Sequence, residues 1–186
     1  VYAYNISSVA DKMGFDVRVV TSYEAGGEPC EENYRVELAA FSRINVENAL
    51  AAIAIATALD IPSEYIVKGL GTAVVPGRLE VIRSKDGSRI AIVDYAHNKL
   101  SYETLFSCLK SEYPDKKFII VFGAPGKKAL HRREELGTVA GINADLSIIT
   151  EEDYGEESPE KICAEIAGYV ENAGGAYEIL YDREDA

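Results

Sequence analysis

The sequence has few of the residues and segments that mark secreted, membrane-spanning or metal-binding proteins. Among 186 residues there are three cysteines, two histidines, one methionine and no tryptophan. The cysteines are far apart and form neither a disulfide framework nor a C-x-x-C ligand pair, so we expect reduced thiols in a cytoplasmic protein. No apolar run approaches the ~18–20 residues of a membrane span. The first residues lack the basic and apolar regions of a signal peptide.

Positive charge is also scarce. The chain has 19 Lys and Arg against 31 Asp and Glu, which gives a net charge of −12. Nucleic-acid and anionic-membrane surfaces need clustered Lys and Arg to meet phosphates, so we expect neither as a partner. With 47% apolar and 27% charged residues, the composition is that of a globular protein with a real core. The length suits one domain or two small ones.

The first part of the chain changes from a strand-like to a helical pattern. Residues 1–41 hold alternating apolar positions on both sides of a turn-forming AGGEP segment at 25–29, which predicts antiparallel strands. Residues 45–60 carry apolar side chains at helical spacing, and Pro62 stops that helix. A second, shorter helix is predicted to follow, with Ser63 as its cap.

A domain boundary is expected near Pro76, so that the domains would cover residues 1–76 and 77–186. Strands and helices alternate beyond it. The strands are expected at 79–84, 90–95, 117–122, 146–150 and 177–181, and the helices at 100–112, 132–142 and 159–173. The run FIIVFG is apolar throughout, as in a strand buried on both faces of a parallel sheet. This pattern predicts an α/β fold with an open, doubly wound, Rossmann-like sheet.

Polar segments follow the predicted strands at the sheet edge where open α/β domains bind ligands. One contains Asp94 and His97, and an aspartate there can bind a ribose, order a metal-bound water or hold a histidine. The plainer interpretation is a helix cap, in which Asn98 accepts hydrogen bonds from the next helix. At the domain boundary, Arg78 either reaches a ligand between the domains or is an ordinary surface arginine.

Two further segments carry opposite charges. Residues 123–133 combine glycines with four cations at a helix start, an arrangement that suits an anion or is simply solvated. This is not a Walker loop, because the chain has no G-x-x-x-x-G-K-[ST]. Residues 151–157 are rich in carboxylates, which hold a metal or an ammonium group, or only favour the dipole of the following helix. None of these segments alone names a reaction.

Four motifs occur in a fixed order along the chain. Residues 44–52 read INVENALAA, and residues 75–80 read VPGRLE. Residues 93–97 read VDYAH, and Phe122-Gly123 begins a glycine-containing loop. The series resembles the Mur ligase family, whose motifs are F-N-x-x-N-A-L-A-A, V-P-G-R-[LM]-E, V-D-Y-A-H and F-G-x-G-G, and it is most similar to the MurE type. Four collinear motifs are far more specific than any one of them.

The resemblance implies ATP-driven amide formation, in which a substrate carboxylate becomes an acyl phosphate and an amine displaces phosphate. By this resemblance, Asn48 contacts the adenine and His97 lies near the nucleotide. Arg78 and Asp94 are the catalytic residues that reach the ATP phosphates and ribose. The Mg²⁺ ligands are expected upstream. The chain would hold the end of the family's central ATPase domain and most of its C-terminal domain, and would be inactive by itself.

The resemblance also bears on the amino acid that is added. Ligases that add diaminopimelate carry D-N-P-R after the strand at 146–150, where this chain reads Glu-Asp-Tyr-Gly at 152–155. The arginine for the distal carboxylate is absent, whereas a side-chain ammonium would pair well with Glu152 or Asp153. Lys128 takes the place of an arginine that binds the α-carboxylate. We therefore predict that L-lysine, or else ornithine or another diamino acid, is added to UDP-N-acetylmuramoyl dipeptide.

Other interpretations stay open. Another ligase of the same superfamily, such as a cyanophycin synthetase-like or folylpolyglutamate synthase-like protein, shares the D-x-A-H-N arrangement. A non-catalytic binding module with this fold would need no nucleotide, although the residue types at the four nucleotide positions argue against it. For the ligase, we expect a cytoplasmic monomer that works in peptidoglycan synthesis.

Overall fold

The computed structural model describes residues 1–9, 12–21, 28–39 and 42–186. Its contacts divide the chain into two compact units, Val1–Tyr95 and Ala96–Ala186. This division does not test the domain boundary expected near Pro76, which therefore stays a prediction. Residues 25–27 of the predicted turn lie outside the described residues. No helix in the described ranges is long and apolar enough to cross a membrane.

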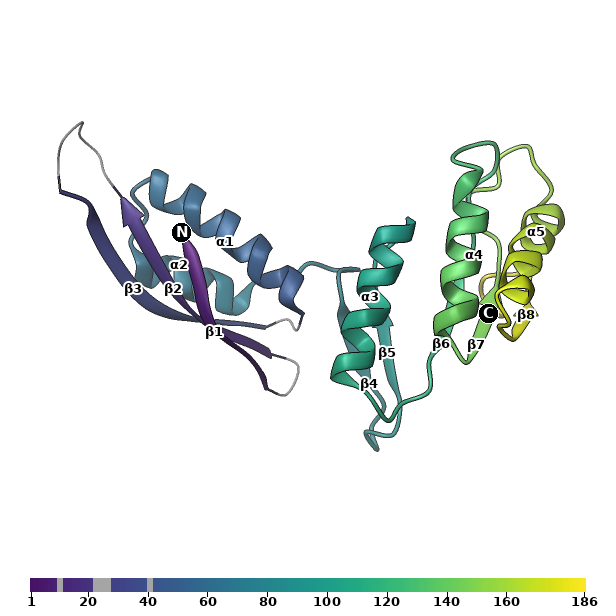
Figure 1. The fold of residues 1–186 in the computed structure, drawn as a ribbon, viewed down its shortest axis with the longest axis horizontal. Helices are drawn as coiled ribbons and strands as arrows, with labels where there is room; N and C mark the ends of the chain where they lie inside the picture. Colours follow the sequence, from purple (N-terminus) through teal and green to yellow (C-terminus); the bar gives the residue numbers. More distant parts are fainter. Residues whose placement is uncertain (10–11, 22–27, 40–41) are drawn as a thin grey trace. The chain divides into compact units, whose positions relative to one another are not determined.

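The first unit contains a three-stranded antiparallel sheet (Figure 1). The middle strand is β2, and the three strands are β1 (Tyr2–Val9), β2 (Lys12–Thr21) and β3 (Cys30–Leu38). Because successive side chains of a strand point to opposite faces, β2 sends Phe15, Val17 and Val19 into the core together. The antiparallel strands predicted within residues 1–41 are confirmed over the described residues.

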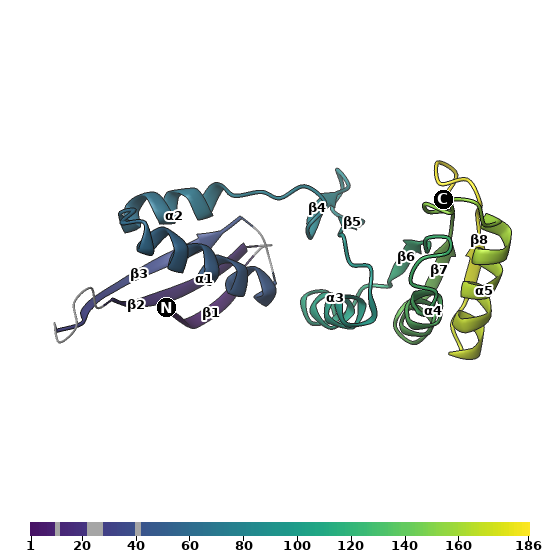
Figure 2. The same cartoon turned by 90° about the horizontal axis from the view of Figure 1, so that it is seen from above.

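Two helices pack against this sheet (Figure 2), namely α1 (Arg43–Ala58) against β1 and β2, and α2 (Ser63–Thr72) against β3. Helix α1 buries Val46, Ala49 and Ile53, which lie on one face at helical spacing. Pro62 separates the helices, because its ring cannot continue α1 but is suited to the position before α2. Both predicted helices are therefore present.

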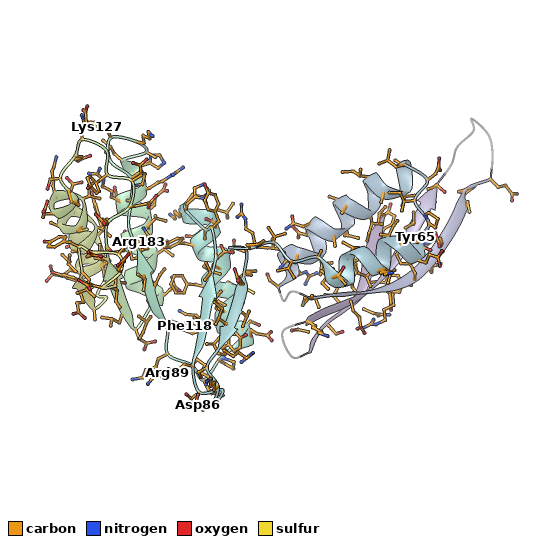
Figure 3. All side chains as sticks on the ribbon, turned by 180° about the vertical axis from the view of Figure 1, so that it is seen from behind. Tyr65, Asp86, Arg89, Phe118, Lys127 and Arg183 are labelled. Atoms are coloured by element: carbon orange, nitrogen blue, oxygen red, sulfur yellow. The ribbon has the colours of Figure 1, made fainter. Side chains whose placement is uncertain are left out.

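A short antiparallel hairpin, β4 (Glu80–Arg83) with β5 (Ile90–Val93), follows in the same unit. Asp86 and Arg89 lie at its tip (Figure 3). Asp86 accepts hydrogen bonds from the hydroxyl of Ser84 and from the amide and hydroxyl of Ser88, and these bonds lower the pKa of Asp86 to about 2. The tight turn fixes where β5 begins, and β5 ends at Val93, the first residue of the VDYAH motif.

The second unit has a parallel sheet in the order β6-β7-β8. Its strands are β6 (Ile119–Phe122), β7 (Leu146–Ile149) and β8 (Tyr177–Ile179). Helices alternate with them, namely α3 (Lys99–Glu112), α4 (His131–Asn143) and α5 (Pro159–Asn172). Helices α4 and α5 lie side by side (Figure 1), so close that a Cβ on Gly137 would be 2.8 Å from that of Tyr169. The predicted α/β, Rossmann-like fold is confirmed.

One core joins these helices to the sheet. Tyr102 on α3 packs edge-on against Phe122 at the end of β6, with 5.8 Å between the ring centroids. Strand β6 is not buried on both faces as its apolar sequence predicted, because Phe122 is 4% exposed but Ile119 and Val121 are 63% and 45% exposed. The described helices of this unit share a single core with the sheet, so alternate side chains of β6 point away from that core.

Candidate functional site

The VPGRLE segment, which contains Arg78, is hydrogen-bonded to Asp94 through its backbone. The backbone turns sharply there, with positive φ at Gly77 (69°) and at Leu79 (47°), and a positive φ is uncommon for a residue with a side chain. The turn lets the amide of Leu79 donate to Asp94 Oδ2 at 2.9 Å. The guanidinium of Arg78 lies over the ring of Tyr95, 4.7 Å from its centroid. Tyr95 thus positions Arg78, a role that the sequence analysis did not assign.

The other two predicted nucleotide residues lie elsewhere. Asn48 is exposed on α1, and half-buried His97 belongs to the second unit. Their approach to the nucleotide therefore stays a prediction. The amides of His97 and Asn98 both donate to Ser101 Oγ at 3.1 Å, and Asn98 Oδ1 accepts from the Ser101 amide. Asn98 is the N-cap of α3 in a reciprocal capping box, as the plainer interpretation of this segment predicted.

Two loops of opposite charge meet in the second unit. The basic loop (residues 123–130) follows β6, and the acidic loop (residues 150–158) follows β7, the neighbouring parallel strand. Lys128 Nζ lies 4.0 Å from Asp153 Oδ2, and both side chains are 78% exposed. Two of the residues predicted to bind the amino acid therefore lie together, with their charged groups open to solvent.

The backbones of the two loops are in direct contact. The Gly126 amide donates to the carbonyl oxygen of Asp153 at 2.9 Å. Gly126 also packs so closely on Tyr154 that a Cβ would overlap the Tyr154 carbonyl, and this approach requires glycine. Exposed Glu152 lies next to the start of the basic loop, because a Cβ on Gly123 would be 3.2 Å from the Glu152 Cβ.

A buried arginine joins the loops. The side chain of Arg133 is 3% exposed and donates to both carboxylate oxygens of Glu157, at 3.0 and 2.7 Å. It also donates to Glu165 on α5 at 2.7 Å. The hydrogen bonds from Arg133, followed by that from the Lys127 amide, lower the pKa of Glu157 to about 2. The carboxylates in turn raise the pKa of Arg133, mainly through its hydrogen bonds to Glu157.

Cations of the basic segment pair with carboxylates, an arrangement that neither of the two expectations for this segment, an anion site or simple solvation, included. Arg133 is buried against carboxylates, and Lys127 Nζ lies 2.6 Å from Glu156 Oε2. The roles of Arg133 and Glu157 were not predicted from the sequence. The sequence did show two segments of opposite charge that follow neighbouring strands. Such segments can form salt bridges with each other, and this could have indicated the pairing of Arg133 with Glu157.

The described residues contain no group of three or more His, Cys, Asp or Glu side chains that could hold a metal ion. The described residues therefore provide no set of ligands for a metal ion at the acidic loop, which was one of the two interpretations of that loop. The carboxylates of Asp153, Glu156 and Glu157 lie instead beside cations. The arrangement suits a ligand that carries both charges, with a carboxylate near Lys128 and an ammonium near Asp153.

Residues 77–186, more than half of the chain, match the family described as "Mur ligase, glutamate ligase domain". The chain belongs to the Mur ligase family. This agrees with the four motifs and with the fold of the second unit. The match also includes Arg78, Asp94 and both charged loops.

Curated relatives bear the names of Mur ligases. The UDP-N-acetylmuramoyl-L-alanyl-D-glutamate--L-lysine ligase of Streptococcus sanguinis is 37% identical over 166 residues, which is 89% of this chain and 33% of that protein. The protein of the same name in Enterococcus faecalis is 34% identical over 142 residues, 76% of this chain and 28% of that protein. The chain thus spans about a third or less of the length of these relatives.

Solved structures of two other proteins have the same fold. Folylpolyglutamate synthase from Thermotoga maritima matches with a TM-score of 0.71 at 20% identity, over 96% of this chain and 39% of that one. UDP-N-acetylmuramate-alanine ligase from the same organism matches with a TM-score of 0.68 at 16% identity, over 97% and 37%. At such identities the likeness shows the fold alone.

Proposed function

We propose that this chain is part of an ATP-dependent ligase that adds L-lysine to UDP-N-acetylmuramoyl-L-alanyl-D-glutamate in peptidoglycan synthesis. The observation that carries the proposal is the exposed pair of Lys128 and Asp153, 4.0 Å apart at the ends of neighbouring strands. The names of the relatives in Streptococcus sanguinis and Enterococcus faecalis support the same reaction. The protein works in the cytoplasm, where its nucleotide-linked substrate and ATP are found.

The proposed reaction has two steps. The substrate carboxylate attacks the γ-phosphorus of ATP, so that the bond to the bridging oxygen breaks and ADP leaves with its electron pair. The amine of lysine then attacks the acyl phosphate, an amide bond forms, and phosphate leaves as the amine loses a proton. Negative charge develops first on the phosphoryl oxygens and then on the tetrahedral oxyanion, so fixed cations favour both transition states.

Each group of residues has its own part in this scheme. Arg78 supplies positive charge to the ATP phosphates, and Asp94, fixed by the Leu79 amide, binds the ribose. Asn48 and His97 approach the same nucleotide. When bound, Mg²⁺ would neutralise phosphate charge, and the described residues supply no ligand set for it.

The amino-acid end of the proposed site favours lysine. Lys128 binds the α-carboxylate, and Glu152 or Asp153 receives the side-chain ammonium. By the family resemblance, Gly155 takes the place of the arginine that binds the distal carboxylate of diaminopimelate. A carboxylate that loses water without gaining a cation is unfavourable, so diaminopimelate is selected against.

The test is a phosphate-release assay on the full-length protein with ATP, the UDP-linked dipeptide and lysine. Release should require all three substrates, and Arg78→Ala should lower kcat/KM for ATP by about 10²–10³-fold, the usual effect of removing a charge-stabilising donor. Arg89→Ala, at the tip of the β4–β5 hairpin, is the matched control and should leave the rate unchanged. Phosphate release that needs a folate in place of the dipeptide would replace this proposal with the folylpolyglutamate synthase-like alternative.

A further inference from the structure

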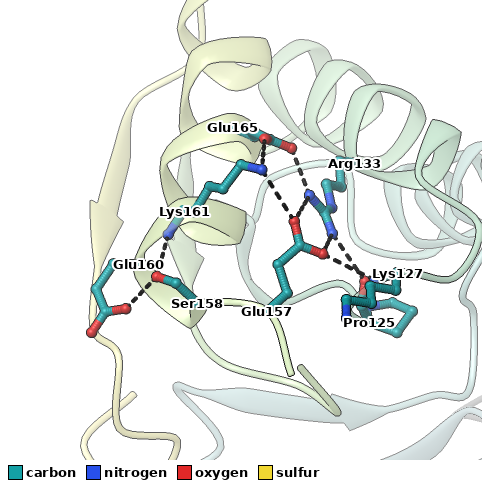
Figure 4. Close-up of polar contacts among 8 residues, drawn as sticks. All are labelled: Pro125, Lys127, Arg133, Glu157, Ser158, Glu160, Lys161 and Glu165. Carbon is teal, nitrogen blue, oxygen red and sulfur yellow. Dashed lines mark hydrogen bonds and ion pairs between the residues drawn. The ribbon is translucent and has the colours of Figure 1, made fainter. Parts of the chain in front are cut away.

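Arg133 makes contacts that reach both loops of the predicted amino-acid site (Figure 4). It lies in the first turn of α4, directly after the basic loop. Nη1 and Nη2 donate to the two oxygens of Glu157 in the acidic loop, and Nη2 also donates to the carbonyl of Pro125 in the basic loop at 3.4 Å. One guanidinium is thus hydrogen-bonded to both loops at once.

Glu157 completes the connection from the other side. Its Oε2 atom, which accepts from Arg133, also accepts from the backbone amide of Lys127 at 3.0 Å. Lys127 is the neighbour of Lys128, so the carboxylate fixes the backbone immediately before the residue predicted to bind the α-carboxylate. On the other side of Lys127, the Gly126 amide donates to the Asp153 carbonyl and so holds the backbone of the basic loop against that of the acidic loop.

Stability alone does not explain the burial of Arg133. The Arg133 side chain is 3% exposed, that of Glu157 is 13% exposed, and Arg133 Nε has no hydrogen-bond partner among the described residues. A buried ion pair stabilises a protein no better than well-packed apolar side chains of similar size. Its distinctive property is geometric, because the planar guanidinium binds a carboxylate through two parallel hydrogen bonds in one orientation only.

We propose that Arg133 is a positioning residue that sets the separation of Lys128 and Asp153, and thereby the affinity of the ligase for its amino acid. This inference rests on the proposed function for the identity of the amino acid. Arg133 does not touch the substrate, and its effect passes through Glu157 and the backbones of the two loops. Its loss therefore weakens amino-acid binding and leaves the ATP-dependent step largely intact.

Steady-state kinetics of the full-length enzyme test this role. Arg133→Met should raise KM for lysine about tenfold or more, with kcat and KM for ATP changed less than about threefold, because only binding of the amino acid is affected. Arg133→Lys keeps the charge but not the two parallel bonds, so its KM should lie between those of the wild type and Arg133→Met. An unchanged KM for lysine in Arg133→Met would overturn the proposal.

Two further variants separate positioning from folding and from charge. Arg133→Met with Glu157→Leu removes both partners and leaves no unpaired buried charge, so it should fold and still show the raised KM. Lys161→Met removes the same single charge from the exposed side of the cluster, where Lys161 Nζ lies 3.6 Å from Glu157, and should leave KM unchanged. An equal rise in KM for Lys161→Met would assign the effect to net charge and contradict the proposal.

Amide hydrogen exchange distinguishes failure of this inference from failure of the proposed function. In Arg133→Met, exchange at Gly126 and Lys127 should accelerate while the central amides of α4 and α5 keep their wild-type rates. If the wild-type enzyme takes another amino acid, the proposed function fails and the kinetic comparison is made with that amino acid. Unchanged exchange at Gly126 and Lys127 would show that Arg133 does not hold the loops, whatever the substrate.

Discussion

The geometry of the candidate site depends on close contacts between backbones as much as on charged side chains. Gly126 allows the basic loop to touch the acidic loop, and its amide donates to Asp153. Arg133 is buried next to these loops and pairs with Glu157 of the acidic loop. Gly126, Arg133 and Glu157 thus determine where the exposed charges of Lys128 and Asp153 lie. Substitutions of residues that do not contact the substrate should therefore alter the geometry of the site.

Substitution of Gly126 by alanine tests this close approach. The added Cβ overlaps the Tyr154 carbonyl, so one loop must move, and we expect a loss of about 1–3 kcal/mol in the free energy of unfolding. Gly168→Ala in α5 is the control, since a Cβ there meets nothing within 4 Å and should stabilise the helix by about 0.5–1 kcal/mol. Urea denaturation of the three proteins measures both effects, and destabilisation of equal size in the two variants would contradict the geometry.

The Arg133–Glu157 pair makes a prediction about acid stability. The pKa of Glu157 is about 2 in the folded chain against an ordinary value of 4.5, so this carboxylate stabilises the fold fully above pH 4.5. That stabilisation is lost as the pH falls from 4.5 towards 2. Glu157→Gln should therefore flatten the fall in denaturation midpoint over this pH range. Parallel curves for wild type and Glu157→Gln would rule out the pair as a source of acid sensitivity.

Helix ends determine where several functional segments begin. Asn98 starts α3 directly after the VDYAH motif, and its reciprocal hydrogen bonds with Ser101 also fix the amide of His97. Ser158 caps α5 directly after Glu157 through the Lys161 amide. In both cases a cap determines the path of a loop that carries candidate site residues.

Loss of the Asn98 cap should destabilise the second unit. Asn98→Ala leaves an amide of the first turn of α3 without its acceptor, which lowers the free energy of unfolding by about 1 kcal/mol. Asn98→Asp retains an oxygen acceptor and should lose much less. Thermal denaturation compares the two, and equal melting temperatures for both variants would show that the side-chain cap contributes nothing.

Elements with a strong local pattern were predictable from the sequence. The helices α1 and α3 to α5 and the strands β6 to β8 follow from apolar spacing, caps and the prolines between them. Exposure of Ile119 and Val121 was not predictable, because an apolar run does not reveal which face its neighbours cover. The role of Arg133 was hidden for the same reason, since its partner Glu157 is 24 residues away and is brought near only by the parallel pairing of β6 and β7.

Across the whole chain, the two halves of the proposed chemistry belong to different compact units. Arg78 and Asp94 lie in the first unit, whereas Lys128 and Asp153 lie in the second. In the first unit a turn and an aromatic ring position the cation, and in the second unit two loops position each other. Substitutions in the two units should therefore change different kinetic constants.

Lys128→Ala in the full-length enzyme should raise KM for lysine about tenfold and leave KM for ATP unchanged, because only the α-carboxylate loses its cation. Lys85→Ala, an exposed lysine of the β4–β5 hairpin, is the control and should behave as wild type. A rise in KM for ATP of the same size as that for lysine would show that Lys128 serves the nucleotide.

The amino acid that the full-length enzyme adds is decided by measuring kcat/KM for L-lysine and for diaminopimelate side by side, with the same UDP-linked dipeptide and ATP. Lysine should be favoured by about a hundredfold or more, because Gly155 offers no cation to the distal carboxylate while Glu152 and Asp153 repel it. Faster ligation of diaminopimelate than of lysine would contradict this prediction.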